Sequence, residues 1–260
     1  MLDLIRWIVE RGHLFVFGSI CTVLVTLTLL APFLRHKLQI KISKEMSDAA
    51  ESAHSAIITF LVFILATSLI TLEGKVNLLN DTVAKEAESL VFASRSLSRL
   101  SESAARQAEI DIRQYTYDII NKEWKLLGSD KYSEDVERDF VKMLEEIEDI
   151  EPQNQHEAEI QDLILHSLQL ADQERQERLA NTGLSLSPIY WAMILGLSVL
   201  LIFLAAMGEW NKQNIIKTGG VTFALALFIS MVLTFECPFN GDVAVKPKQI
   251  EIALKKMSQH

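Results

Sequence analysis

The sequence predicts an all-α integral membrane protein in which four transmembrane helices form two hairpins that flank a helical extramembrane domain. Hydrophobic residues make up 49% of the chain and charged residues 23%, a combination that predicts their segregation. The uncharged residues gather into four runs, at residues 14–34, 55–72, 185–208 and 219–235. Each run is near the length of about 20 residues that a helix needs to cross a bilayer. None of them alternates between apolar and polar residues, so helices are expected rather than barrel strands.

These runs divide the chain into four parts. We expect a first transmembrane hairpin at residues 1–74, an acidic helical domain at 75–183, a second hairpin at 184–236 and a C-terminal tail at 237–260. Burial of the runs in a soluble core is an alternative, but the polar remainder is too short to enclose four helices that are apolar on every side.

A cleaved signal peptide is an alternative for the first run, because Arg6 and Arg11 precede it. The length of the run favours a retained helix, and so does its end at Ala31-Pro32-Phe33, which lacks a small-x-small cleavage site.

The domain at the middle of the chain is acidic. Residues 75–182 contain 13 Lys and Arg against 24 Asp and Glu, whereas the rest of the chain contains 12 and 10. Nucleic acids and anionic lipid surfaces bind basic faces. We therefore expect neither of them as a partner of this domain.

Apolar spacing predicts the helices of this domain. No Gly or Pro occurs from Lys75 to Leu127, and the apolar residues keep helical spacing, so we expect one long helix that continues out of the second membrane helix. Ser133 is expected to cap a second helix. After Pro152 a third helix is expected, and its inward-facing residues are Ile160, Leu163, Ile164 and Leu168. The domain would then be a helical hairpin or a three-helix bundle.

Enzyme motifs are not found in the sequence. There is no Gly-rich phosphate loop, nucleophile elbow or HExxH pattern. No two histidines have the i, i+4 spacing of a helical metal site, and Cys21 and Cys237 lack metal-ligand spacing. We expect no catalytic residue, no metal and no cofactor. The four runs also lack charged residues, which disfavours a proton relay but allows a pore lined by hydroxyl or apolar groups.

Small and hydroxyl-bearing residues recur in the first run. Gly18, Thr22 and Thr26 are spaced by four residues, and Ser19 lies beside them. Small residues let helices approach closely, so helix packing is the first interpretation and a polar pore stripe is the second.

The second run carries its own hydroxyl residues, which include Thr59 and Thr67 as candidates for packing or pore lining. They are spread around the helix circumference, so we expect no single lining face. The full set is Ser55, Thr59, Thr67, Ser68 and Thr71.

The C-terminal region carries a family motif. Residues 236–247, Glu-Cys-Pro-Phe-Asn-Gly-Asp-Val-Ala-Val-Lys-Pro, resemble the D-x-P-F-x-G-x-x-x-V-x-P signature of DUF4239, a bestrophin-like family of bacterial membrane proteins. Residues 83–87 resemble its V-x-x-E-A element, Glu123-Trp124 resembles its E-W pair, and residues 182–191 resemble its lead into the third membrane helix. The resemblance extends from about His54 to Met257. Glu236 stands where aspartate is usual and Cys237 where arginine is common, so no role is carried over that needs the arginine's charge.

The motif residues Pro238, Phe239, Gly241 and Asp242 are expected to form a docking point between the tail and the helices, or a pore mouth. Proline prevents the fourth helix from continuing, and glycine permits a turn that bulkier residues cannot adopt. The alternative is a simple helix terminator followed by an extended tail.

Bestrophins are oligomeric anion channels with two membrane hairpins around a helical domain. The resemblance therefore implies a homo-oligomeric, multi-pass protein of the bacterial inner membrane that forms or gates an ion pathway. The alternative is a membrane-anchored scaffold or sensor whose helical domain binds a partner protein. Lys and Arg are denser in the short loops at residues 35–54 and 209–218, which favours a cytoplasmic position for these loops.

Overall fold

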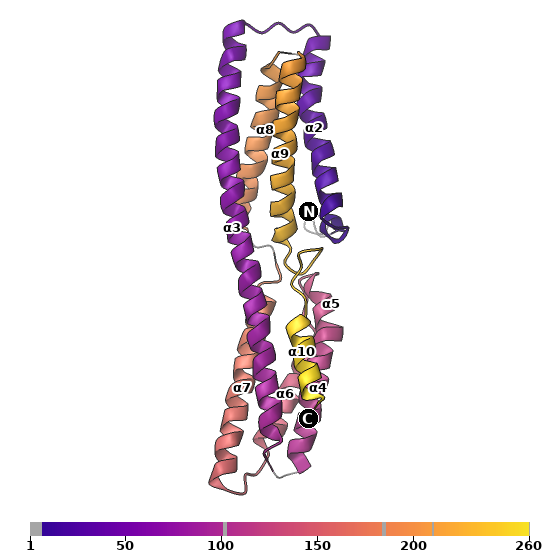
Figure 1. Ribbon diagram of the computed structural model, residues 1–260, viewed down its shortest axis with the longest axis vertical. Coiled ribbons are helices and arrows are strands. Elements are labelled where there is room, and N and C mark those ends of the chain that lie inside the picture. Colours follow the sequence, from indigo (N-terminus) through magenta and orange to yellow (C-terminus); the bar gives the residue numbers. More distant parts are fainter. Residues whose placement is uncertain (1–6, 101–102, 184–185, 210, 260) are drawn as a thin grey trace. The chain divides into compact units, whose positions relative to one another are not determined.

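The computed structural model describes residues 7–100, 103–183, 186–209 and 211–259. Every regular element among these residues is a helix, and four helices are long and apolar enough to cross a membrane (Figure 1). The fold is therefore all-α, as predicted. The elements are α2 (His13–Lys37), α3 (Lys44–Leu97), α4 (Ser103–Asp118), the π-helix η1 (Ile119–Glu123), α5 (Trp124–Leu127), α6 (Glu134–Glu148), α7 (Gln155–Ala180), α8 (Pro188–Met207), α9 (Lys212–Glu236) and α10 (Lys248–Met257).

The chain forms two compact units. The membrane unit comprises Met1–Lys75 and Leu184–Val243, and the polar unit comprises Val76–Gly183 and Ala244–His260. Helix α3 contributes to both units, and the C-terminal segment is divided between them after Val243.

The membrane unit contains α2, the first part of α3, α8 and α9. The uncharged runs at residues 14–34, 55–72 and 219–235 lie within α2, α3 and α9. The run at 185–208 overlaps α8, and its first residue, Ser185, lies outside the described residues.

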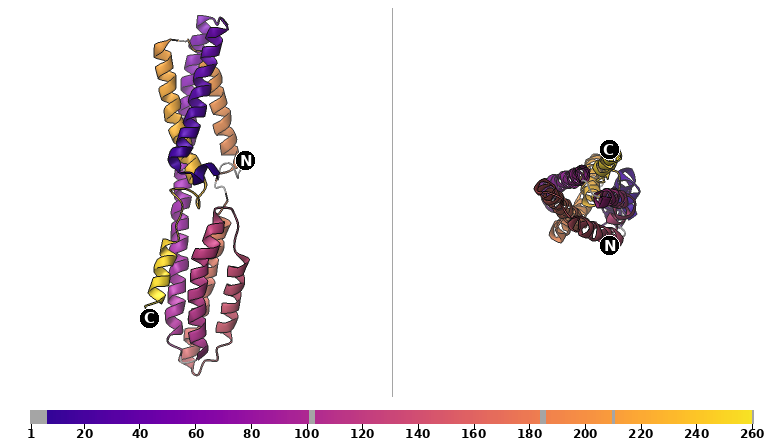
Figure 2. Two further views of the ribbon diagram at one scale, coloured as in Figure 1. Left: turned by 90° about the vertical axis from the view of Figure 1, so that its right-hand side faces the viewer. Right: turned by 90° about the horizontal axis from the view of Figure 1, so that it is seen from below.

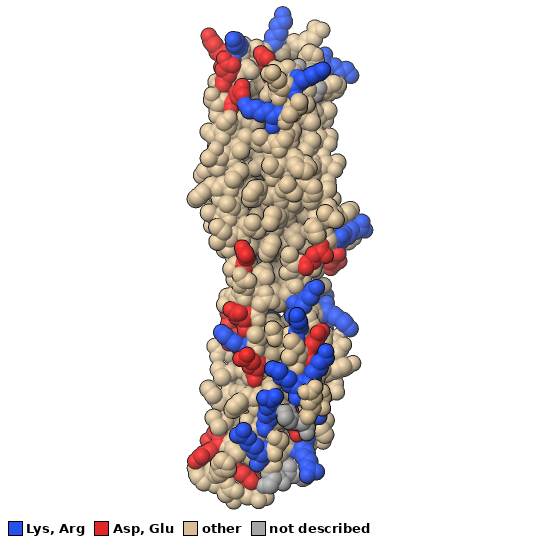
Figure 3. Space-filling view, viewed as in Figure 1, with Lys and Arg blue, Asp and Glu red and all other residues tan. Residues whose placement is uncertain are grey.

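Most apolar side chains of the membrane unit point outward. Only 11% to 39% of the most apolar stretch of each helix is buried. Figure 3 shows the body of this unit without charge, while Lys, Arg, Asp and Glu gather at the end where α2 connects to α3. Such a surface is stable in lipid and unfavourable in water, because exposed apolar area of this extent drives association.

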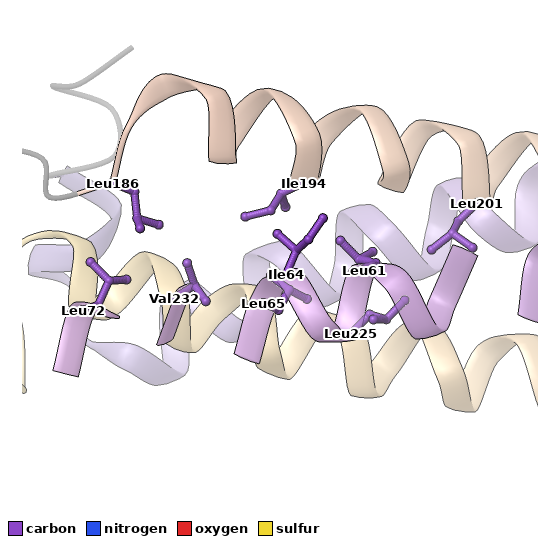
Figure 4. Close-up of a cluster of buried hydrophobic side chains, with 9 residues drawn as sticks. All are labelled: Leu61, Ile64, Leu65, Leu72, Leu186, Ile194, Leu201, Leu225 and Val232. Atoms are coloured by element: carbon purple, nitrogen blue, oxygen red, sulfur yellow. The ribbon is translucent and has the colours of Figure 1, made fainter. Parts of the chain in front are cut away.

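The interior of the membrane unit is a narrow seam where α3 packs against α8 and α9. Nine apolar side chains form it (Figure 4): Leu61, Ile64, Leu65, Leu72, Leu186, Ile194, Leu201, Leu225 and Val232. Helix α2 lies against α8 and α9, and the rings of Phe17 and Phe223 meet edge to face at 5.3 Å. Lipid tails are as apolar as these side chains, so van der Waals fit holds the seam together.

Helix α3 continues out of the membrane unit, as the sequence predicts, but the expected single helix to Leu127 is wrong. Helix α3 ends at Leu97 and α4 begins at Ser103. Three serines at 94, 96 and 98 precede the break, and the Ser98 hydroxyl donates to the Arg95 carbonyl. Serine hydroxyls compete for backbone hydrogen bonds and so weaken a helix, a signal that a search for Gly and Pro alone misses.

The polar unit therefore contains the end of α3 and the separate helix α4 where one long helix was predicted, and the tail adds α10. Helix α6 contacts α4 and α7, and α10 contacts α4 (Figures 1 and 2). Helix α7 meets α3 where the Ser167 hydroxyl donates to the Ser89 carbonyl at 2.8 Å. The rings of Tyr115 and Phe140 pack at 5.2 Å in the interior.

The helix ends of the polar unit follow their sequence signals. Ser133 caps α6, and its hydroxyl accepts from the backbone N–H of Val136. Asn154 caps α7 in the same way. On α7, Ile160, Ile164 and Leu168 are buried as predicted, whereas the predicted burial of Leu163 is wrong because that side chain is 52% exposed.

Candidate functional site

The motif at the C-terminal end of α9 begins with a buried carboxylate. Glu236 is the last residue of α9 and is fully buried. Its two carboxylate oxygens accept from the backbone N–H of Leu186 at 3.1 and 3.2 Å, and Oε1 also accepts from the Trp191 indole N–H at 3.2 Å. The carboxylate thereby connects the end of α9 to the start of α8, two elements that the resemblance treats as separate motifs.

The next part of the motif docks on the segment that precedes α2. Asp242 Oδ2 accepts from the backbone N–H of His13 at 2.9 Å and lies 2.7 Å from its Nδ1. The Asn240 amide donates to Glu10 Oε1 at 3.2 Å. A carboxylate at a helix N-terminus is favourable because the first N–H groups have no partner within the helix, so Asp242 stabilises the start of α2.

Gly241 makes this docking possible. Its φ is +77°, in the left-handed region, and a Cβ at this position would lie 2.9 Å from the Val9 carbonyl oxygen. Only glycine satisfies both conditions without a shift of the backbone. The four motif residues Pro238, Phe239, Gly241 and Asp242 thus belong to a turn that joins the C-terminal end of α9 to the N-terminal end of α2. In this turn Pro238 is buried and Phe239 is partly buried.

The small residues of α2 lie on its outer surface. Gly18, Thr22 and Thr26 are exposed, and Ser19 is partly buried. A Cβ on Gly18 would meet no atom within 4 Å. Gly18 therefore has no close helix contact inside the described part of one chain.

Four hydroxyl residues of α3 recur at a spacing of four residues, at positions 55, 59, 67 and 71 with Phe63 between them. Each step of four residues turns about 40° around a helix, so this row winds along the surface, and the expectation that the hydroxyls define no single lining face stays a prediction. Ser55, Thr59 and Thr71 are exposed, Thr67 is partly buried, and only Ser68 lies in the interior. The hydroxyls donate to the carbonyl four residues earlier, for example Thr59 to Ser55 at 3.1 Å and Thr71 to Thr67 at 2.9 Å. Phe63 stands in the middle of the row and is 64% exposed.

A buried ion network lies within the polar unit. The side chains of Arg175, Arg178, Glu86 and Glu123 are fully buried. Arg178 donates to Glu86 through Nε and Nη2, at 2.8 and 2.9 Å, and through Nη2 to Glu123 at 2.9 Å. Arg175 donates to Glu123 at 2.6 and 3.2 Å and also pairs with the partly exposed Glu137. The four buried charges cancel in number.

The network favours the charged forms of Glu123, Arg175 and Arg178. Burial raises the pKa of Glu123, but the hydrogen bonds and charges of Arg175 and Arg178 outweigh burial and hold this pKa below its ordinary value of 4.5. Burial lowers the pKa of each arginine, and the facing glutamates more than compensate, so both pKa values are raised. Glu123, Arg175 and Arg178 are thus fixed charges and not proton donors or acceptors near neutral pH.

The network brings together two motif elements that are far apart in the sequence. Glu86 belongs to the V-x-x-E-A element on α3, and Glu123 and Trp124 form the E-W pair. The Arg178 guanidinium carbon lies 5.0 Å from the centre of the Trp124 ring. Glu123 is also the last residue of the π-helix η1, and such one-turn insertions change the direction in which the following side chains point.

Sequence reasoning missed Arg175 and Arg178. A signal was present, because the buried stripe of Ile164, Leu168 and Ala171 on α7 continues at helical spacing to these two arginines. Charged residues in register with an apolar stripe indicate a buried ion pair. Among the described residues no group of His, Cys, Asp and Glu could hold a metal ion.

Comparisons with known proteins show the family and the fold of this chain. A family model described as a bestrophin-like domain matches residues 20–250. None of the curated proteins matches this chain. A crystal structure of a membrane protein has a TM-score of 0.62 at 13% identity and covers 94% of this chain and 97% of its own.

Two crystal structures of a bacterial bestrophin homolog from Klebsiella pneumoniae, each with one substitution, are also similar. Their TM-scores are 0.55 and 0.54 at 16% and 14% identity. They cover 93% and 94% of this chain and 99% and 98% of their own. At these identities the likeness establishes a shared fold. Since the family model covers most of the sequence, the chain is a multi-pass membrane protein that belongs to the bestrophin-like family.

Proposed function

We propose that several copies of this chain assemble in the membrane around an ion pathway lined by the outer face of α3. The single observation that carries this proposal is the contrast between the exposed faces of α3 and α8. The outer row of α3 holds four hydroxyl side chains around Phe63. None of the exposed residues of α8 from 192 to 203 carries a hydroxyl group, and the large ones are Met193, Leu195, Val199, Leu200 and Phe203. The surface of α3 also exposes Phe60 and Ile70, so the contrast lies in its hydroxyl row.

This contrast has a physical reason. A face that contacts lipid gains nothing from hydroxyl groups, and a pore needs polar groups or backbone at its wall. The exposed face of α8 is therefore suited to contact with lipid, and the hydroxyl row of α3 is suited to line a water-filled pathway. The exposed residues Gly18, Thr22 and Thr26 of α2, with the partly buried Ser19 beside them, suit close contact between neighbouring copies, because small side chains let helices approach.

Phe63 is proposed as the constriction of the pathway. A ring of large apolar side chains at one level, contributed by several copies, excludes water when it is narrow and thus gates ions without any charge. Phe63 is the most exposed phenylalanine among the described residues, and hydroxyl residues lie on both sides of it along α3.

Ion flux into liposomes tests the proposal. Purified protein should pass ions faster than empty vesicles, and Phe63→Ala should raise the flux because it widens the constriction. Phe203→Ala, which truncates the same side chain on the apolar face of α8, is the matched control and should leave flux unchanged. Absence of flux across salts and pH, together with a monomeric complex in detergent, would remove the proposal.

A membrane-anchored scaffold or sensor is the second candidate. Leu163 and Leu170 on α7 are 52% and 41% exposed and lie two turns apart on one face, as an interaction surface for a partner protein requires. A stable oligomer that conducts no ion, and that loses a co-purifying partner when Leu163→Glu is introduced, would favour this function. Neither candidate involves a catalysed reaction.

We further propose that the protein resides in the bacterial inner membrane and belongs to the narrower DUF4239 group. The proposal rests on the motif at residues 236–247 and on the contacts of Glu236, Gly241 and Asp242. Fractionation of the cells that express the chain natively tests the location. Recovery of the protein in any fraction other than the inner membrane would contradict it.

A further inference from the structure

A polar cavity of about 470 Å³ lies at one end of the membrane unit. It is formed between the first turns of α3, the C-terminal end of α8 and the N-terminal end of α9. Figure 3 shows the charged side chains that gather at this end of the unit. The volume is in the range of sites that hold small ligands or headgroups.

Charges of both signs line this cavity. Lys44 and Lys217 are basic, and Asp48, Glu51 and Glu209 are acidic. Lys217 on α9 forms an ion pair with Glu51 on α3. The lining therefore offers ammonium groups and the N-terminus of a 25-residue helix to an anion, and carboxylates to a cation.

The walls of the cavity are held in place by hydrogen bonds. The Asn211 side chain caps α9 by accepting from the backbone N–H of Asn214 at 2.8 Å, and the Asn214 amide donates to the Glu209 carbonyl at 2.9 Å. At the α8 end, Arg35 donates to the carbonyls of Met207 and Gly208, both at 2.7 Å. The end of α8 and the start of α9 are thereby fixed beside the cavity.

The cavity lies at the boundary between polar and apolar sequence. His54 and Thr218 line it and are the residues that directly precede the uncharged runs of α3 and α9. His54 also lines a second, inner cavity of about 20 Å³, which holds about one water molecule. A ligand larger than water therefore stops at His54, at the level where a bilayer has its headgroups.

We propose that this cavity binds a zwitterion that carries a phosphate and a primary ammonium group. The phosphate contacts Lys217, Lys44 and the start of α9, and the ammonium contacts Asp48 and Glu209. A headgroup with a primary ammonium donates hydrogen bonds to these carboxylates, whereas a quaternary ammonium has no N–H to donate. Phosphatidylethanolamine and free phosphoethanolamine both carry the required chemistry.

Lipid binding to the purified full chain tests this site. Native mass spectrometry should show phosphatidylethanolamine binding about tenfold more tightly than phosphatidylcholine or phosphatidylglycerol of the same acyl chains, the effect of one charge-assisted hydrogen bond. Glu209→Gln should reduce the preference over phosphatidylcholine, and Lys217→Met should weaken the binding of all three lipids.

Matched controls lie at exposed positions outside the cavity. Glu45→Gln on α3 and Lys37→Met in the last turn of α2 remove the same charges from residues that do not line it, and each should bind like the parent protein. Equal binding of the three lipids, or equal effects of the lining and control variants, would overturn the proposal. Since two different lining residues are changed, misfolding of one variant leaves the other as a test.

Competition separates the two sources of the ligand. If phosphoethanolamine displaces the lipid, the headgroup alone suffices and a water-soluble ligand is assigned. If it does not, while the lipid preference holds, the ligand is the lipid itself. Neither outcome depends on ion flux, so failure of this proposal and failure of the ion pathway are distinguishable.

Discussion

Arg178 joins three separate residues of the polar unit. It is fully buried and joins Glu86 on α3 to Glu123 on η1, with Trp124 beside it. A buried ion pair adds little stability over apolar packing, but removal of one partner leaves the other charge buried without compensation. The network therefore specifies how these helices fit.

Substitution of Arg178 by methionine should destabilise the polar unit by about 3–5 kcal/mol, because Glu86 stays buried without its counter-charge and Glu123 keeps only Arg175. Thermal unfolding in detergent, followed by circular dichroism, should show a lower midpoint. Arg138→Met is the matched control, because its side chain is 76% exposed and its pair with Asp135 is local. Equal midpoints for the two variants would show that the buried network does not stabilise the unit.

Gly241 is the second position where one residue decides local structure. An alanine there would require a strained φ and would press against the Val9 carbonyl oxygen. Gly241→Ala should cost about 1–3 kcal/mol and release the segment before α2, which hydrogen exchange of residues 7–12 would detect. Gly196→Ala on α8 is the control, since its Cβ would meet no atom within 4 Å. Unchanged protection of residues 7–12 would contradict the docking role of the motif.

At the scale of elements, α10 depends on its contact with α4. The helix has only 10 residues, of which Ile250, Ala253 and Met257 are buried, and the Thr116 hydroxyl lies 3.9 Å from the Met257 sulfur. Isolated helices shorter than about 12–15 residues are marginal in water. Helix α10 should therefore unfold when it is detached.

Ile250→Asp should detach α10, because it places a charge in the apolar contact with α4. Hydrogen exchange of residues 248–257 should lose protection, while that of α6 is kept. Ile252→Asp on the same helix is the control, because Ile252 is 36% exposed. If both variants keep full protection, the apolar face of α10 does not hold it in place.

Element boundaries show where sequence reasoning succeeds and where it fails. Ser133 and Asn154 cap their helices through local hydrogen bonds, so a capping signal near Ser133 could be recognised without tertiary information. The end of α3 at Leu97 was missed, since a cluster of serines weakens a helix without excluding it. Burial on α7 was assigned correctly for Ile160 and wrongly for Leu163, because neighbouring helices decide which part of a stripe is covered.

At the scale of the whole molecule, the two units depend on different interactions. The membrane unit has an apolar outer surface that only lipid or another copy can cover. The polar unit depends on a buried set of charges. Conditions that change charge should therefore affect the polar unit more.

Acid should destabilise the polar unit selectively. The pKa of Glu123 is lower in the folded protein than its ordinary value of 4.5, so its contribution to stability is complete above about pH 4.5 and is lost as pH falls toward the folded pKa. Thermal unfolding between pH 7 and pH 3 should show this loss. Glu123→Gln should be less stable at neutral pH and should show a weaker pH dependence. An identical pH dependence in both proteins would exclude Glu123 as the cause.

The sequence alone determined that the chain is helical and spans a membrane, because the length and uniform apolarity of a run decide its preference for lipid without reference to any neighbour. It also supplied the motif elements that resemble the family. Only the tertiary structure showed that Glu86, Glu123 and Arg178 form one network, that Gly241 allows the tail to dock near Val9, and that Ser68 is the one buried hydroxyl residue among the five at residues 55–71 of α3. Contacts between distant residues depend on how helices pack, and helical periodicity carries no information about which helix lies opposite.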